Sequence, residues 1–153
     1  MSNETLYYNA FSGMTLRERD AVVQFLEQHE KTKHKEHIDE ALDYALKIKP
    51  SFGGFVLVAK REEKIRGVIV SNCTGMAGYN ASHLFVFATY PHQSKEDRSV
   101  MLDLMQQAIR YAKGQVALHI PPDHPALTLF QQLGFKSELL ALRLDSPVAM
   151  AVA

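Results

Sequence analysis

The order of patterns along the 153 residues predicts an α+β domain built on a mixed sheet. A short strand pattern and two helical patterns come first. A β-hairpin pattern follows, where the apolar spacing changes from about four residues to about two. Two further helices then alternate with short apolar strands. No repeat, low-complexity segment or linker divides the chain, so we predict a single domain over residues 1–153.

The first third of the chain predicts a short strand and two helices. The strand covers residues 5–11. Thr15 and Glu18 have the capping-box spacing, in which a hydroxyl and a carboxylate bind free backbone N–H groups at a helix start. The charged stretch KTKHKEH, residues 31–37, predicts a solvated link. The second helix ends before Pro50, and its apolar face comprises Ile38, Ala41, Leu42, Ala45, Leu46 and Ile48.

The middle of the chain predicts three sheet strands. Residues 55–60 and 65–71 flank the turn REEK and read as an antiparallel hairpin. A glycine-containing loop follows, and then the strand HLFVFATY, residues 83–90. This strand is apolar on both faces, which is typical of a central position in a sheet.

The last third predicts two helices and two strands. A helix over residues 95–113 precedes the buried strand VALHI, residues 116–120. A second helix covers about 124–133, with Asp123 as its N-cap. The stretch LLALRL, residues 139–144, predicts a final strand.

Composition narrows the function classes. Lys plus Arg and Asp plus Glu each number 17, so the formal net charge is zero and no broad attraction to nucleic acid is expected. The sequence lacks a signal-peptide pattern and an apolar run of membrane-spanning length. Cys73 is the single cysteine, which favours a reducing compartment. We therefore expect a cytoplasmic protein without nucleic-acid or membrane partners.

The turn between the strand at 83–90 and the helix at 95–113 has the position of a phosphate-binding turn. Backbone N–H groups at a helix start bind anions, and glycines usually let the ligand approach. This turn has no glycine. Ser94 and Asp97 have capping-box spacing, and Asp97 and Glu96 oppose a pyrophosphate, whereas Lys95 and Arg98 favour one. A capped surface turn is the alternative interpretation.

Two stretches carry a resemblance to a known family. The stretch from Asp123 to Phe135 is similar to the late helix of the GNAT N-acyltransferases, whose usual form is Asn-x-x-Ala-x-x-Leu-Tyr-x-x-x-Gly-Phe. Asp123 stands at the asparagine and Phe130 at the tyrosine; the matching residues are Ala126, Leu129, Gly134 and Phe135. The hairpin, with Gly67, resembles the family's second and third strands. In element order the resemblance covers most of residues 5 to 145.

The resemblance implies a GNAT-like, mostly antiparallel central sheet flanked by helices, and acetyl-coenzyme A as co-substrate. The family's coenzyme motif falls on Ser94, Asp97 and Ser99, and none of the three matches it. The central strand is implied to part from its neighbour, so that a backbone N–H near its end polarises the thioester carbonyl. The implied coenzyme-binding residues are Phe87, Ala88, Thr89, Tyr90, Ser94, Lys95, Asp97, Arg98, Ser99, Asp123 and Phe130.

Acyl transfer to an amine needs a base and an acid. The tyrosine that often serves as acid in the family is Phe130 here, which carries no proton to give. His119 lies out of phase with the apolar residues of its strand, and an imidazole can accept the amine proton; a core histidine bonded to backbone is the alternative. Tyr90 is the candidate proton donor, and a packed aromatic is its alternative.

The histidines near residues 29–37 do not predict a metal site, because no cysteine or carboxylate stands at a recognisable ligand spacing. We expect neither a metal nor a reactive thiol at Cys73.

Three functions remain open. The first is an acyl-coenzyme A-dependent N-acyltransferase that transfers acetyl to a primary amine of a small molecule or peptide. The second is a non-catalytic domain of the same fold that senses a ligand or binds a protein. The third is a homo-oligomeric scaffold. The apolar C-terminal tail is compatible with a homodimer, and the sequence does not name the acceptor.

Overall fold

The computed structural model describes residues 4–30, 34–75, 83–89, 94–138, 142 and 144, with the backbone alone for Leu84 and residues 86–89. These residues form β1 (Glu4–Tyr8), α1 (Leu16–His29), α2 (Lys35–Ala45), β2 (Gly54–Arg61), β3 (Lys64–Cys73), β4 (His83–Thr89), α3 (Lys95–Ala112), β5 (Val116–Leu118) and α4 (Leu127–Gln132). The predicted element order is confirmed up to α4. The final predicted strand, residues 139–144, lies mostly outside the described residues.

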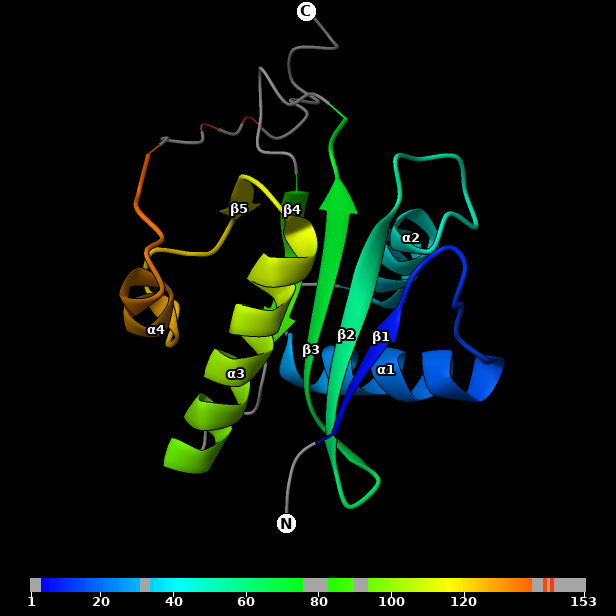
Figure 1. Cartoon of the computed structure of the whole chain (residues 1–153), viewed down its shortest axis with the longest axis horizontal. Coiled ribbons are helices and arrows are strands. Elements are labelled where there is room, and N and C mark those ends of the chain that lie inside the picture. Colours follow the sequence, from blue (N-terminus) through cyan, green and yellow to red (C-terminus); the bar gives the residue numbers. More distant parts are fainter. Residues whose placement is uncertain are drawn as a thin grey trace, which may run out of the picture.

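The strands form one sheet in the order β1-β2-β3-β4-β5. Neighbours are antiparallel except for β4 and β5, which are parallel. Figure 1 shows α3 across the front of this sheet, with α1 and α2 behind it. The prediction of an α+β fold with a mixed, mostly antiparallel sheet is confirmed.

Each face of the sheet carries its own apolar core, because side chains along β2 and β3 alternate between the two faces. Leu57 and Ile69 face α3 and α4. Val58 and Val68 face α1 and α2. All four side chains are buried, so the predicted hairpin lies at the centre of the molecule with helices on both sides.

Side-chain contacts fix the start of α1. Thr15 Oγ1 accepts from the N–H of Glu18 at 3.1 Å, and Glu18 Oε1 accepts from the N–H of Thr15 at 2.8 Å, which confirms the predicted capping box. The Tyr8 hydroxyl donates to Glu18 Oε2 at 2.6 Å. Burial and this hydrogen bond raise the pKa of Tyr8, whereas the hydrogen bond from Tyr8 lowers the pKa of Glu18. The contact therefore ties β1 to the first turn of α1.

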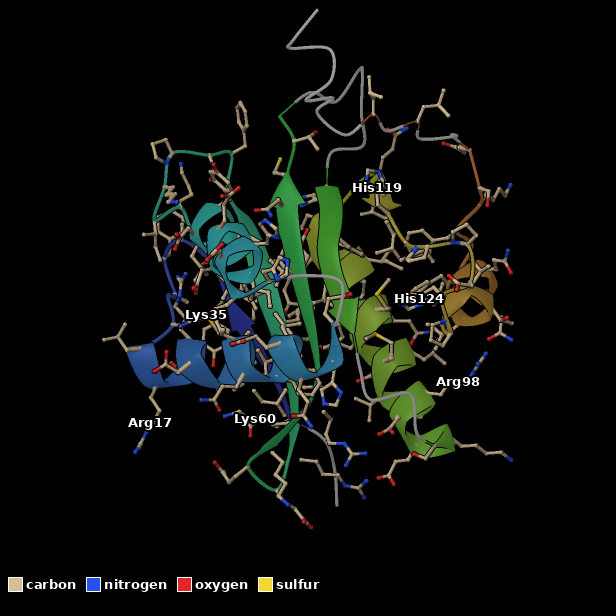
Figure 2. The ribbon with its side chains drawn as sticks, turned by 180° about the vertical axis from the view of Figure 1, so that it is seen from behind. Arg17, Lys35, Lys60, Arg98, His119 and His124 are labelled. Carbon is tan, nitrogen blue, oxygen red and sulfur yellow. The ribbon has the colours of Figure 1, made fainter. Side chains whose placement is uncertain are left out.

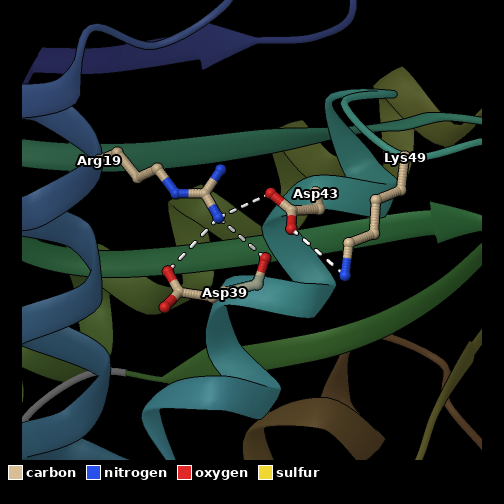
Figure 3. A network of polar contacts seen from close by, with 4 residues as sticks. All are labelled: Arg19, Asp39, Asp43 and Lys49. Atoms are coloured by element: carbon tan, nitrogen blue, oxygen red, sulfur yellow. Dashed lines mark hydrogen bonds and ion pairs between the residues drawn. The ribbon is translucent and has the colours of Figure 1, made fainter.

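An arginine joins the two helices behind the sheet (Figure 3). Arg19 Nη2 lies 2.8 Å from Asp43 Oδ1 and donates to the backbone oxygen of Asp39 at 2.9 Å. Lys49 Nζ lies 3.8 Å from the other oxygen of Asp43. These contacts link α1 to α2 across the side of the sheet opposite α3.

Three element boundaries in the first third of the chain differ from the prediction. The first strand ends at Tyr8 rather than at residue 11. The helix α2 begins within the stretch predicted as a link, and it ends at Ala45 because Lys47 takes a left-handed conformation, with φ 56°. Ile48 is consequently 64% exposed, so the prediction that it belongs to the apolar face of this helix is wrong.

The hairpin turn between β2 and β3 consists of Glu62 and Glu63, with φ of 52° and 68°. Both central residues of a type I′ turn have positive φ, which favours Asn and Gly rather than Glu.

At the far end of β2, a Cβ on Gly54 would lie 1.9 Å from the backbone oxygen of Ser71, so only glycine fits there.

Candidate functional site

The strand β4 and its parallel neighbour β5 separate after three residue pairs. His83, Leu84 and Phe85 of β4 face Val116, Ala117 and Leu118 of β5. Within the described chain, residues 87–89 then pair with β3 alone. We call the β5-facing backbone of residues 87–89 the unpaired edge.

A β-bulge lies where the two strands part. Val70 pairs with Phe87 and Ser71 with Phe85, so Val86 is the extra residue on β4. A bulge bends its strand and redirects the backbone groups around it. The unpaired edge therefore begins just after a bend in β4, two residues beyond the last pair with β5.

A capped helix start stands at the other end of β4. Ser94 is the N-cap of α3, and its Oγ accepts from the N–H of Asp97 at 3.1 Å. The predicted helix start at Ser94 is confirmed. Because the cap occupies the N–H of Asp97, an anion bound at this turn would be left with the other N–H groups of the first turn.

The structure adds two arginines to this turn that the sequence analysis did not connect with it. Arg66 Nη2 lies 2.5 Å from Asp97 Oδ1, and Arg61 is ion-paired with Glu96. Both arginines come from the β2–β3 hairpin, whose turn lies at the same end of the molecule as the start of α3 (Figure 1). No local pattern could have revealed these pairs, since about thirty residues separate the partners in sequence.

The pairs change the electrostatic balance of the turn. Glu96 and Asp97 each have an arginine partner, so neither carboxylate stands as an uncompensated negative charge. Lys95 is exposed, and Arg98 Nη2 donates to Gln132 Oε1 at 3.2 Å. The turn is therefore more favourable to an anion than its own sequence indicates.

His119 lies at the junction of the two strands. It follows Leu118, the last residue of β5, and its side chain is exposed, whereas Val116, Leu118 and Ile120 pack against the core. The prediction that His119 faces away from the apolar residues of its strand is confirmed, and the alternative interpretation of a core histidine is wrong. Figure 2 shows His119 beside β5, far along α3 from Arg98 in its first turns.

The late helix is shorter than predicted, and Asp123 does not cap it. α4 begins at Leu127 after Ala126, and Asp123 is exposed. Instead, His124 Nδ1 accepts from the N–H of Ala126 at 3.0 Å. The residue before a proline is disfavoured in the helical conformation, which explains why the helix begins only after Pro125.

The residues that resemble the family motif are mainly packing residues. Phe130 is 1% exposed, and its ring centroid lies 6.2 Å from that of Phe135. Gly134 has φ 104°, and the N–H of Phe135 reaches back to the backbone oxygen of Phe130 at 3.2 Å. The glycine thus lets the chain reverse and places both aromatic rings in the core facing α3.

Several candidate residues are described only in part. Tyr90 lies outside the described residues, and Phe87, Ala88 and Thr89 contribute their backbone positions. Ser99 is exposed on α3.

A polar pair on the α3 side of the sheet, formed by buried Ser71 and half-buried His83, was missed in the sequence analysis. Ser71 is fully buried, and its Oγ lies 3.1 Å from His83 Nδ1. The ring of His83 also packs near Phe55, with centroids 5.7 Å apart. Burial lowers the pKa of His83. Along β4, Phe85 lies between His83 and the unpaired edge, and it is 1% exposed. We therefore assign the Ser71–His83 pair to packing.

Membrane-spanning helices and metal-binding clusters are both absent from the described part of the chain. No helix there is both long and apolar enough to cross a membrane. The same residues contain no group of three or more His, Cys, Asp or Glu side chains that could hold a metal ion.

Comparison with known proteins rests on structure. No family model and no curated protein matches the sequence. An aminoglycoside acetyltransferase, meta-AAC0020 from an uncultured soil metagenomic sample, solved in complex with sisomicin, is 15% identical with a TM-score of 0.64, and the match covers 95% of this chain and 96% of that one. AAC(6')-Iy, an aminoglycoside N-acetyltransferase solved in complex with CoA, is 13% identical with a TM-score of 0.63, over 95% and 97%.

A third match has a different description. A transcriptional regulator from Bacillus halodurans C-125 is 19% identical with a TM-score of 0.65, and the match covers 94% of this chain and all of that one, 100%. These identities are low, so the matches define the fold. The chain has the GNAT acetyltransferase fold, as the resemblance implies.

Proposed function

We propose that the protein is an acyl-coenzyme A-dependent N-acyltransferase that transfers acetyl from acetyl-coenzyme A to a primary amine. The observation that carries the proposal is the unpaired edge of β4, which begins at the bulge and runs toward the start of α3. Its backbone groups can pair with the amide groups of a pantetheine arm. The first turn of α3 then takes the pyrophosphate at the far end of the same ligand.

The chemistry is a direct attack on the thioester. The amine nitrogen forms a bond to the carbonyl carbon, and the bond from carbon to sulfur breaks. The amine loses a proton, and the departing thiolate takes one. A backbone N–H of the unpaired edge stabilises the charge that develops on the carbonyl oxygen.

We assign the base to His119. It stands one residue beyond the last pair of β5, level with the bulge, and its exposed side chain is open to an incoming amine. Tyr90 remains our candidate for the acid that protonates the thiolate, because it directly follows the unpaired edge in sequence. Phe130 has no proton to give and is buried.

A second candidate function is a ligand-sensing domain that binds acyl-coenzyme A without transferring the acyl group. The observation that favours it is Phe130, buried where the family's tyrosine acid usually stands. The match to a protein described as a transcriptional regulator also supports this candidate.

Thermal unfolding with millimolar acetyl-coenzyme A, coenzyme A or ADP tests the proposal. A ligand at one hundred times its Kd stabilises the folded state by about 2.7 kcal/mol. We expect both coenzyme forms to raise Tm, and ADP to raise it less because it lacks the pantetheine arm. Absence of any shift with the coenzymes would refute the proposal.

A transfer assay separates the two candidates. A broad panel of primary amines is incubated with acetyl-coenzyme A, and the release of the free coenzyme thiol is followed. Release that depends on the amine supports the acyltransferase. A Tm shift without release across the panel supports the sensing domain instead.

A further inference from the structure

A β-bulge in β3 sets the direction of the Arg66 side chain. Ala59 pairs with Gly67 and Lys60 with Ile65, which leaves Arg66 as the extra residue of a β-bulge. A bulge twists its strand and re-aims the side chain that it carries. Here the side chain of Arg66 crosses from the hairpin to the first turn of α3 and reaches Asp97.

The contact with Asp97 is well shielded from water. The side chain of Asp97 is 4% exposed and that of Arg66 is 31% exposed. Arg66 Nε is buried as well, and it has no hydrogen-bond partner in the described part of the chain. Attraction between charges is stronger where water is excluded, so this pair holds the two elements at a defined separation.

Asp97 is held through both its side chain and its backbone. Its carboxylate binds Arg66, and its backbone N–H donates to Ser94 Oγ at 3.1 Å. The first turn of α3 is therefore attached to β3 through a side chain and to the preceding turn through the cap. These ties fix the direction of the N–H groups that face an anion.

A neighbouring pair provides a natural comparison. Arg61 also leaves the hairpin and pairs with Glu96, but the side chain of Glu96 is 51% exposed. Exposed ion pairs contribute little, because water screens the charges and both side chains lose freedom. The two pairs thus differ in the burial of the carboxylate, while the arginines are similarly exposed at 30% and 31% and both pairs join the same elements.

We propose that Arg66 is a positioning residue for coenzyme binding, which acts through its ion pair with Asp97 and takes over the part that glycines play in phosphate-binding turns. Glycines let a backbone adopt the shape that an anion requires. In this chain the turn before α3 has no glycine. The Arg66–Asp97 ion pair sets the shape of this turn instead, because it holds the turn against β3. The inference rests on the proposed function, since it presupposes that the turn binds the pyrophosphate.

Calorimetric titration with coenzyme A tests the inference, using R66M, D97N and the double variant. We expect each to weaken binding about tenfold or more, and the double variant to be no weaker than the singles, because the residues act as one unit. The matched controls R61M and E96Q should change Kd less than about threefold.

The D97N result shows whether Arg66 acts through Asp97 or contacts the phosphate directly. Asparagine keeps the shape of the side chain but releases Arg66 from its charged partner. If Arg66 itself bound the phosphate, D97N would bind coenzyme A as tightly as the wild type or more tightly. That outcome would overturn the inference.

Folding is checked by circular dichroism and by Tm, and each titration is made well below the Tm of the variant. If R66M does not fold, D97N and R66K carry the test, and R66K should retain most of the affinity. A wild-type protein that fails to bind coenzyme A would refute the proposed function, and this inference with it. Binding by the wild type with unchanged Kd in D97N would refute the inference alone.

Discussion

The sheet has a closed half and an open half. In the closed half, β2 and β3 run side by side along their lengths, and helices cover both faces. In the open half, β4 and β5 share three pairs and then part. The apolar residues that hold the fold together are concentrated in the first, and every candidate reactive or ligand-binding position lies in the second or next to it.

This division indicates why the fold can place a site at one edge without losing its stability. Both apolar cores are built on β2 and β3, and β5 adds only the partly buried Val116 and Leu118 to the core that faces α3. The free backbone groups of β4 can then remain available to a ligand. Changes in the two halves should accordingly have separate effects, on stability in one and on activity in the other.

The largest expected effect is loss of stability from Ile69→Ala in the closed half. Ile69 is fully buried between β2, β4 and α3, and truncation of such a side chain typically costs about 2–5 kcal/mol. Urea unfolding followed by circular dichroism measures it. The control is Ile48→Ala, which removes an exposed side chain and should change the free energy of unfolding by less than about 0.5 kcal/mol.

The next effect concerns the open half. His119→Gln should lower kcat for an identified amine by about one hundredfold or more, as expected for loss of a general base. Because His119 is exposed, Tm should remain within the error of the wild type. Steady-state kinetics with saturating acetyl-coenzyme A would show this. An unchanged kcat would remove His119 from the mechanism.

A smaller effect is expected at the cap of α1. Thr15→Ala removes the oxygen that accepts from the N–H of Glu18, and loss of such a cap costs about 1 kcal/mol. Thr15→Ser keeps the oxygen and should cost much less. Chemical unfolding of both variants compares them, and equal losses would mean that the methyl group rather than the cap matters.

The smallest effect is a pH dependence at the junction of the two halves. Burial lowers the pKa of His83 in the folded protein below its ordinary value of 6.5. The unfolded chain therefore binds a proton first as pH falls, and the stability that neutral His83 contributes above pH 6.5 is lost on going below it. His83→Gln should flatten the fall of Tm between pH 7 and 5, and thermal unfolding across this range measures it.

Local patterns in the sequence predicted most of the fold. The alternation in residues 55–71 predicted the hairpin, and Thr15 with Glu18 predicted the start of α1. The errors occur where one residue's backbone conformation decides the outcome. Lys47 ends α2 early through a positive φ, and Pro125 delays α4. Neither effect appears in the spacing of apolar residues.

The site could be predicted only where it is local in sequence. The cap at Ser94 and the phase of His119 follow from neighbouring residues, and both are present in the structure. The link from Arg66 to Asp97 is different, because it depends on a bulge and on the packing of α3 against the hairpin. A bulge changes the register by one residue, and the alternation of apolar residues around it does not reveal that shift.

The hairpin turn has a consequence for how this chain can change. Glu62 and Glu63 both occupy left-handed conformations, which carry a steric cost for any residue with a Cβ. Replacing them by Asn and Gly, the pair that such turns favour, should make the protein more resistant to heat. The present sequence is therefore not the most stable one for its own backbone. Substitutions in this solvent-facing turn can raise the stability of the fold.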